Sequence, residues 1–162
     1  MYTKNTERRR IIVSKEIVII TGGASGLGLE LVKQFMEKSY FVCNIDRDFE
    51  KMKALNDTYK DNYRGFTGNI SDNEFVKNII YEISNLGNIK ILINNAEEPS
   101  FKLPTKYEKE DIDKCFKGLQ GMILFSTEVL KVKKEKDLKI VNIMSSVALR
   151  GNKQETVYCA TK

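Results

Sequence analysis

The chain has 162 residues, 41% of them hydrophobic and 30% charged, which is typical of a soluble globular protein with room for one domain and its core. It contains no histidine, and this excludes Ser-His-Asp hydrolysis, histidine-ligated metal sites and acid–base catalysis by histidine. The formal net charge is +5, but positions 1–10 hold four basic residues and one acidic residue, so the rest of the chain carries only +2.

The basic residues at the start, Lys4 and Arg8-Arg9-Arg10, belong to an arm that we expect to be disordered over residues 1–15. An arm that binds a partner is the alternative interpretation. Because little net charge remains for the rest of the chain, we expect no nucleic-acid-binding face on the folded part.

The sequence shows no sign of export or of a membrane segment. The apolar run behind the arm covers only residues 11–13, and no later stretch approaches the ~20 apolar residues of a membrane span. Cys43, Cys115 and Cys159 are odd in number and form no C-x-x-C pair, so we expect reduced, buried cysteines with neither a disulfide nor a zinc site. These features predict a cytoplasmic protein without a bound metal.

Strand and helix patterns alternate through the rest of the chain. We expect strands at about 17–20, 40–45, 63–67, 89–93 and 138–144, and helices at about 29–38, 49–59, 71–86 and 108–134. The third helix begins with the capping-box pattern Ser71-x-x-Glu74. Such alternation predicts an α/β fold with a doubly wound parallel sheet of Rossmann type over residues 16–162, with strand order 3-2-1-4-5.

The segment between the first strand and the first helix has the pattern of a phosphate-binding turn. It reads Thr21-Gly22-Gly23-Ala24-Ser25-Gly26-Leu27-Gly28, directly behind a β-branched run. Glycines allow the backbone to approach a pyrophosphate, and the free N–H groups at a helix start attract the anion. A glycine-rich turn without a ligand is the alternative. The candidate cofactor-binding residues of this turn are Thr21, Gly22, Gly23, Ser25, Gly26, Leu27 and Gly28.

Asp46, at the end of the second strand, lies 18 residues beyond Gly28, near the offset at which an acidic residue meets the adenosine ribose. A carboxylate there favours NAD over NADP, because it would repel a 2′-phosphate. Arg47 favours the opposite choice, because its guanidinium could bind that phosphate. NADP therefore stays open as the second choice. A strand-end turn residue or a helix cap is the plain alternative for Asp46.

The last residues of the chain carry a candidate catalytic group. Tyr158 and Lys162 are spaced i, i+4 and would share a helical face, with Ser145 thirteen residues before the tyrosine. An ammonium near a phenol stabilises the phenolate, so we expect Lys162 to lower the pKa of Tyr158. Ordinary surface pairing is the alternative for an isolated tyrosine and lysine at this spacing.

Together these motifs resemble the short-chain dehydrogenase/reductase family over residues 16–162. The matching segments, in the family's order and spacing, are Thr21-Gly22-x-x-x-Gly26-x-Gly28, Asn94-Asn95-Ala96, the strand 140–143 followed by serine, and Tyr158-x-x-x-Lys162. The resemblance implies hydride transfer between a nicotinamide and a small alcohol or carbonyl substrate.

The resemblance also implies roles for individual residues. Tyr158 would exchange a proton with the substrate oxygen, Ser145 would hydrogen-bond that oxygen, and Lys162 would hold the nicotinamide ribose and tune Tyr158. Ser146 is the alternative to Ser145, although the spacing to Tyr158 favours Ser145. Asn94 would fix the fourth strand beside the cofactor. The remaining implied cofactor-binding residues are Asp46, Arg47, Asn69 (where the family has an aspartate), Ile70, Asn95, Ala96, Tyr158 and Lys162.

Three departures from the family pattern set this chain apart. Glu97 replaces the glycine that follows Asn-Asn-Ala, and Gly118 stands where the long helix supplies the asparagine of a proton relay. The chain also ends at Lys162, before the remaining units of the family domain, so we expect the domain to be incomplete and strand 138–144 to be an exposed edge. We also expect helix 108–134 to lack its usual neighbour in the family's homo-oligomer. Two interpretations follow: an NAD(P)-dependent oxidoreductase, or a truncated nucleotide-binding remnant without turnover.

Overall fold

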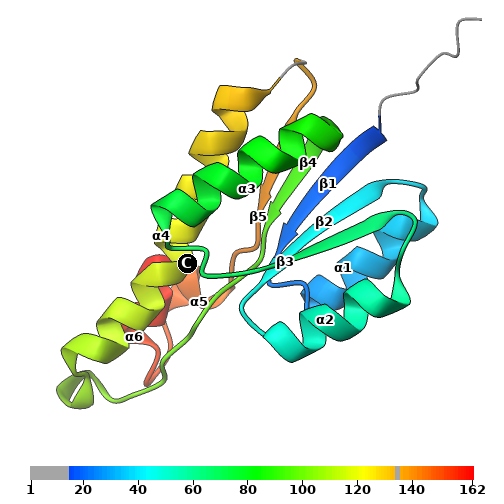
Figure 1. Ribbon diagram of the computed structural model, residues 1–162. Coiled ribbons are helices and arrows are strands. Elements are labelled where there is room, and N and C mark those ends of the chain that lie inside the picture. The colour runs from blue at the N-terminus through cyan, green and yellow to red at the C-terminus, as the bar shows by residue number, and fades with distance from the viewer. Residues whose placement is uncertain (1–14, 134–135) are drawn as a thin grey trace, which may run out of the picture.

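The computed structural model describes residues 15–133 and 136–162, which form one five-stranded parallel sheet with helices on both faces (Figure 1). The expected strand order β3-β2-β1-β4-β5 is confirmed. The strands are β1 (Lys15–Thr21), β2 (Phe41–Asp46), β3 (Tyr63–Thr67), β4 (Gly87–Asn94) and β5 (Lys139–Asn142). The expected arm lies outside the described residues, except that its last residue, Lys15, is the first residue of β1.

The first strand is central because its residues are apolar on both faces. Residues 17–20 are fully buried between β2 and β4, with Ile17 opposite Phe41 on one side and Ile89 on the other. The register with β4 shifts by one residue after Ile17, so Lys90 has no opposite residue in β1. A strand buried on both faces and both edges fixes the position of the turn that follows it.

The two faces of the sheet have separate cores. Ile17 and Ile19 pack with α3 (Asn73–Leu86) and α4 (Lys109–Val132), where Phe125 is fully buried. Val18 and Ile20 face the opposite side and pack with α1 (Gly26–Glu37), near α2 (Phe49–Thr58). Because successive residues of a strand point to opposite faces, one continuous apolar run supplies both cores.

Two helix starts differ from the sequence expectation. Helix α1 begins at Gly26 rather than at about residue 29, and α3 begins at Asn73 rather than at Ser71. The expected capping residue Ser71 is not the N-cap of α3. Asp72 is the N-cap, and its carboxylate accepts hydrogen bonds from the amides of Glu74 and Phe75 at 3.0 and 3.1 Å. The Ser71 hydroxyl instead donates to Asn69 Oδ1 at 2.9 Å. An aspartate one position later fulfils the same capping function, so the helix begins at Asn73.

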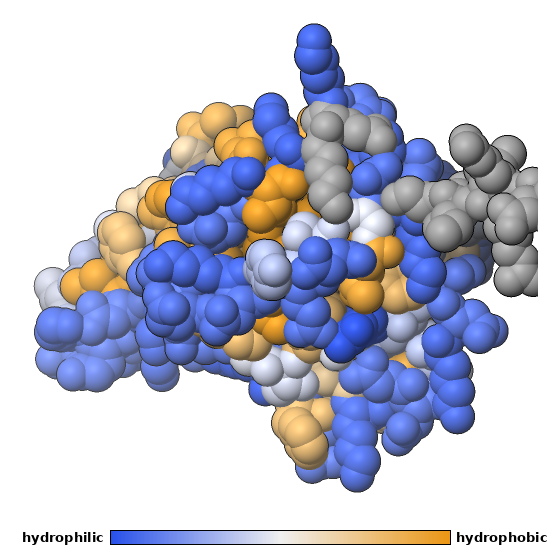
Figure 2. Space-filling view, turned by 45° about the horizontal axis from the view of Figure 1, so that its top comes forward, coloured by the Kyte–Doolittle hydropathy of each residue, from blue (hydrophilic) through white to orange (hydrophobic). Residues whose placement is uncertain are grey.

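The last part of the chain leaves apolar surface exposed. A 3-10 turn, η1 (Pro104–Lys106), precedes α4, and two short helices, α5 (Val147–Arg150) and α6 (Thr156–Thr161), follow β5. Strand β5 lies at the edge of the sheet, as expected, with Val141 43% exposed. Four apolar residues of α4 are exposed as well, Ile112, Phe116, Ile123 and Leu130. Apolar side chains also break the mostly hydrophilic surface on the face that Figure 2 shows.

Among the described residues, Cys43 and Cys115 are buried, Cys159 is half-buried rather than buried, and all three are free. Burial raises the pKa of the Cys43 thiol to about 12, which makes this cysteine unreactive at neutral pH. Within the described ranges there is no cluster of residues that could hold a metal ion, and no helix is long and apolar enough to cross a membrane.

The buried and exposed sides of α4 predict responses of different size to the same substitution. Phe125→Ala should lower the free energy of unfolding by about 3–5 kcal/mol, because it empties a fully buried site. Phe116 is 45% exposed, and Phe116→Ala should change the free energy of unfolding by only about 0.5 kcal/mol. Urea denaturation of both variants measures the difference, and equal effects would contradict the described packing of α4.

Candidate active site

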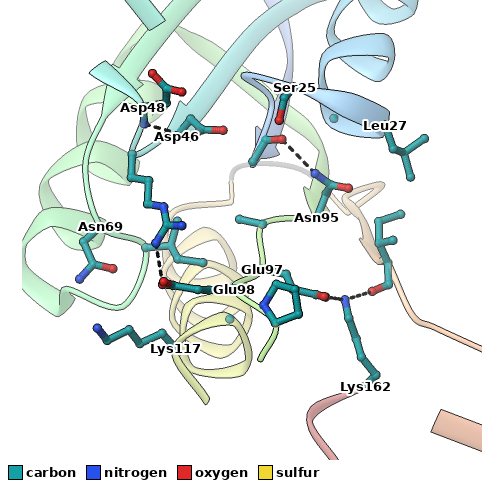
Figure 3. A pocket seen from close by; sticks show the side chains of 18 of the residues that line it. Ser25, Leu27, Asp46, Asp48, Asn69, Asn95, Glu97, Glu98, Lys117 and Lys162 are labelled. Carbon is teal, nitrogen blue, oxygen red and sulfur yellow. Dashed lines mark hydrogen bonds and ion pairs between the residues drawn. The ribbon is translucent and has the colours of Figure 1, made fainter. Parts of the chain in front are cut away.

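A pocket of about 570 Å³ lies at the carboxyl ends of the strands (Figure 3). Its wall is built from segments that follow all five strands, together with α4 and α6. The expected site residues that line it are Gly22, Ser25, Leu27, Gly28, Asp46, Arg47, Asn69, Ile70, Asn95, Ala96, Ser145, Tyr158 and Lys162. The residues before α1 and the residues near the chain end, more than 110 positions apart, therefore share one cavity.

The glycine turn is shaped by close backbone contacts. Gly22 has a φ of +72°, and its amide donates to the carbonyl of Ile45 at 2.7 Å. A Cβ on Gly28 would lie 2.1 Å from the Gly22 carbonyl oxygen. No larger residue fits at position 28, and the turn brings the second and third residues of α1, Leu27 and Gly28, to the pocket wall.

Thr21 and Asn95 tie this turn to the end of β4. The Thr21 hydroxyl accepts hydrogen bonds from the amides of Asn95 and Ala96, both at 3.1 Å. The Asn95 carboxamide donates to the carbonyls of Thr21 at 3.0 Å and Gly22 at 3.1 Å. These four bonds hold the two loops at a fixed separation.

Four expected cofactor-binding residues do not line the pocket. Thr21 acts through the bonds just described, and Gly26 faces open space with a φ of +53°. Gly23 packs against the buried Asn44 side chain, where a Cβ would lie 2.1 Å from Asn44 Oδ1. Asn94 is buried, and its carboxamide donates to Ser126 Oγ at 3.1 Å and Asn142 Oδ1 at 2.8 Å. Asn94 therefore joins β4 to α4 and β5, and Asn95 is the asparagine that reaches the turn.

The carboxylate of Asp46 lies at the pocket end nearest β2. One oxygen accepts from the Ala24 amide at 3.0 Å and the other from the Asp48 amide at 3.1 Å. Each oxygen keeps a second lone pair for a ligand hydroxyl. The neighbouring Arg47 guanidinium binds the Glu98 carboxylate at 2.6 Å, and a dashed line at Glu98 in Figure 3 marks this ion pair.

Asn69 and Ile70, after β3, form the adjoining wall. Asn69 Oδ1 accepts from the Ser71 amide at 3.0 Å and from the Ser71 hydroxyl. Its carboxamide nitrogen therefore is the group left to face a ligand. Ile70 packs on Gly121 of α4, where a Cβ would lie 2.5 Å from Ile70 Cδ1.

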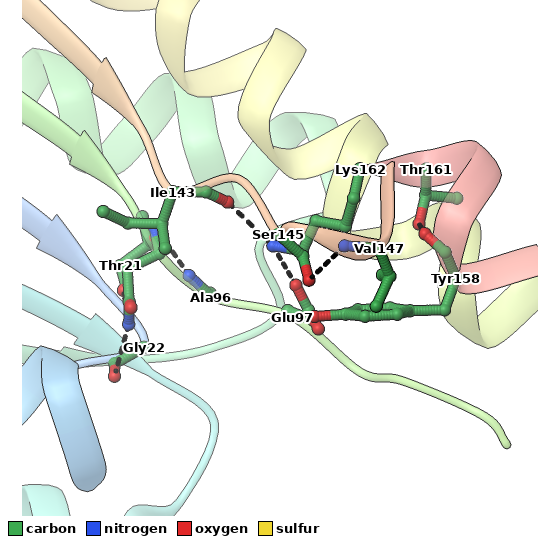
Figure 4. A network of polar contacts seen from close by, with 11 residues as sticks. Thr21, Gly22, Ala96, Glu97, Ile143, Ser145, Val147, Tyr158, Thr161 and Lys162 are labelled. Carbon is green, nitrogen blue, oxygen red and sulfur yellow. Dashed lines mark hydrogen bonds and ion pairs between the residues drawn. The ribbon is translucent and has the colours of Figure 1, made fainter. Parts of the chain in front are cut away.

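Ser145, Tyr158 and Lys162 meet at the opposite end of the pocket (Figure 4). Lys162 Nζ lies 5.8 Å from the centre of the Tyr158 ring and donates to the Ile143 carbonyl at 2.8 Å. It also forms an ion pair with the Glu97 carboxylate. The Tyr158 ring meets the Phe101 ring edge to face, with centroids 5.7 Å apart.

The electrostatics of Tyr158 differ from the sequence expectation. The pKa of its phenol is raised, first by burial and then by a hydrogen bond to Glu97 and the charge of that carboxylate. A hydrogen bond from Ser145 acts in the opposite direction. The expected lowering of the Tyr158 pKa is wrong in this structure, where the Lys162 ammonium is also paired with Glu97.

The comparisons with known proteins agree with this geometry. The sequence model of the family described as short chain dehydrogenase matches residues 16–162. The chain belongs to the short-chain dehydrogenase family. A 3-oxoacyl-[acyl-carrier-protein] reductase of Rickettsia prowazekii is 32% identical over 146 residues, which cover 89% of this chain and 59% of the relative. The enzyme of that name from Haemophilus influenzae is 28% identical over 150 residues, covering 91% and 62%.

Solved structures of the family share the fold. A short-chain dehydrogenase from Streptomyces avermitilis superposes with a TM-score of 0.84 at 20% identity, over 94% of this chain and 57% of that one. A short-chain dehydrogenase/reductase from Vibrio parahaemolyticus gives 0.79 at 24% identity, over 90% and 63%. The chain thus spans about three fifths of the length of the relatives it matches.

Sequence reasoning missed several pocket residues of this family member. Glu98 is the most consequential, because it neutralises Arg47 from 51 positions away. No local sequence pattern predicts an ion pair between residues so far apart. Lys51, Lys117 and Met144 also line the pocket. They come from helices and a loop whose sequence fits ordinary exposed positions, so only the fold reveals them.

The Thr21 hydroxyl predicts a clear stability difference between two small substitutions. Thr21→Val keeps the shape but leaves the amides of Asn95 and Ala96 without their acceptor, which should cost about 1–3 kcal/mol of unfolding free energy. Thr21→Ser keeps the hydroxyl and should cost less than half as much. Chemical denaturation of both variants tests this, and a valine variant as stable as the serine variant would count against the described role.

Proposed function

We propose that this protein binds NAD(H) and works as an oxidoreductase on a small alcohol or carbonyl substrate. The observation that carries the proposal is the meeting, in one pocket, of a dinucleotide-type glycine turn with the Ser145–Tyr158–Lys162 group. When bound, the nicotinamide would supply a hydride to a carbonyl carbon or take one from an alcohol.

The chemistry of the wall fits a dinucleotide. Leu27 and Gly28 present the start of α1, where backbone N–H groups bind a diphosphate. Asp46 offers carboxylate oxygens for the adenosine ribose hydroxyls, and the Asn69 carboxamide lies on the same side for the adenine. The Lys162 ammonium has a third N–H for the other ribose, beyond its bonds to Ile143 and Glu97.

The charges around Asp46 favour NAD over NADP. A 2′-phosphate would be repelled by the Asp46 carboxylate and by the Glu98 carboxylate. The Arg47 guanidinium is already paired with Glu98. With Arg47 held by Glu98 and Lys51 held by Asp48, neither side chain is available to bind that phosphate. Arg47 is therefore a weak candidate for a phosphate ligand as long as Glu98 holds it.

The proton step falls to Tyr158. In the reducing direction its O–H bond breaks and the proton passes to the substrate oxygen, and solvent then returns a proton to the phenolate. The Ser145 hydroxyl, which hydrogen-bonds the phenol, is placed to donate to the same substrate oxygen. Phe101 and Met144, both exposed, give this end of the site apolar surface for the substrate's carbon chain.

The relatives named 3-oxoacyl-[acyl-carrier-protein] reductases support a 3-oxo group on an acyl chain as the first substrate class to assay. We further propose a cytoplasmic location, in keeping with the free cysteines. Nucleotide binding without turnover is the second candidate function, because Lys162 is paired with Glu97 rather than free beside Tyr158.

Tyr158→Phe separates these two functions. It should reduce turnover of a carbonyl substrate about 100-fold or more, because the proton donor is lost, while NADH affinity stays nearly unchanged. Steady-state kinetics and NADH titration measure the two effects. Full activity in the variant would remove Tyr158 from the mechanism, and saturable binding with no turnover in the wild type would favour the binding-only function.

The cofactor preference has its own test. Asp46→Ala should weaken NADH binding about tenfold and NADPH binding less, because it removes an acceptor that only an unphosphorylated ribose can use. Glu98→Gln should strengthen NADPH binding by up to about fivefold, because it frees Arg47. Fluorescence titration gives both affinities, and the reverse ranking in either variant would contradict the assignment.

A further inference from the structure

Glu97 places a carboxylate inside the Tyr158 end of the pocket. The residue follows Ala96 in the loop after β4, and its side chain is only 21% exposed. It pairs with Lys162, whose side chain is 13% exposed and whose second bond goes to the Ile143 carbonyl. The carboxylate is therefore held in one place, with Lys162 and Tyr158 as its neighbours (Figure 4).

Gly118 of α4 lies next to the backbone of Ala96 and Glu97. A Cβ at position 118 would lie 3.4 Å from Glu97 Cα and 3.5 Å from the Ala96 carbonyl oxygen. Glu97 and Gly118, the two residues that depart from the family pattern, are therefore neighbours in the structure.

The groups around the Tyr158 phenol come from three parts of the chain. Glu97 and Phe101 belong to the loop after β4, Ser145 follows β5, and Glu155 and Lys162 flank α6. Both carboxylates raise the pKa of Tyr158 and the Ser145 hydrogen bond lowers it. Lys162 is the one cation within this set, and Glu97 offsets its charge.

We propose that Glu97 is a positioning residue that fixes the Lys162 ammonium and keeps Tyr158 in its protonated, proton-donating form. The inference rests on the proposed function and extends it, because a phenol that keeps its proton suits carbonyl reduction. In that direction the Tyr158 proton goes to the substrate oxygen. Alcohol oxidation needs the phenolate to accept a proton, so it requires a higher pH in this protein than it would without Glu97.

The test is the titration of Tyr158 itself, which needs neither cofactor nor turnover. Phenolate formation is followed by ultraviolet difference spectroscopy against pH, with the same variant carrying Tyr158→Phe as the background to subtract. Glu97→Gln keeps the size and removes the charge, and should lower the Tyr158 midpoint by about one pH unit or more. Glu98→Gln is the matched control, since its partner is Arg47, and should leave the midpoint in place.

A midpoint that stays or rises in Glu97→Gln would overturn the proposal. Glu97→Ala provides a second variant should the glutamine form fail to fold, and the same fall in midpoint is expected. Where the protein is active, the alkaline limb of the reduction rate should move to lower pH in Glu97→Gln by the same interval. A failure of wild-type NADH binding would remove the proposed function while leaving the titration result to stand by itself.

Discussion

The site depends on the hydrogen bonds that join the end of β1 to the end of β4. These two neighbouring strands lead to opposite faces of the sheet, because β1 continues into α1 on one face and β4 into the loop before α4 on the other. Ligands of doubly wound sheets bind in the crevice at such a reversal. Thr21 and Asn95 close the crevice at its base, so that the glycine turn and the loop 95–98 face each other across the pocket.

Two consecutive acidic residues then set the charge of that pocket. Glu98 pairs with Arg47 at the Asp46 end, and Glu97 pairs with Lys162 at the Tyr158 end. Each pair removes a cation that a short-chain dehydrogenase could otherwise offer to an anionic or developing charge. Because both glutamates lie in one short loop after β4, this segment influences the cofactor preference and the proton step together.

Much of the fold and site could be predicted from sequence, because the pattern is local. Three features are recognised from residues close together in the sequence: the apolar run 17–20, the glycine turn, and the spacing of Tyr158 and Lys162. The run forms the buried strand behind the pocket, and the other two line the pocket. The prediction of Ser71 as the helix cap was wrong, because the neighbouring Asp72 caps equally well. The ion pairs of Glu97 and Glu98 join positions 65 and 51 residues apart, so the raised pKa of Tyr158 needed the three-dimensional arrangement.

The central claim is that the turn before α1 and the carboxylate of Asp46 hold a dinucleotide. Isothermal titration calorimetry of the folded protein with NADH tests it most directly. We expect saturable binding at one site per chain, competed by NAD and weakened by Gly28→Ala, whose Cβ would meet the Gly22 carbonyl. A protein with intact circular dichroism that shows no saturable NADH binding would contradict the account.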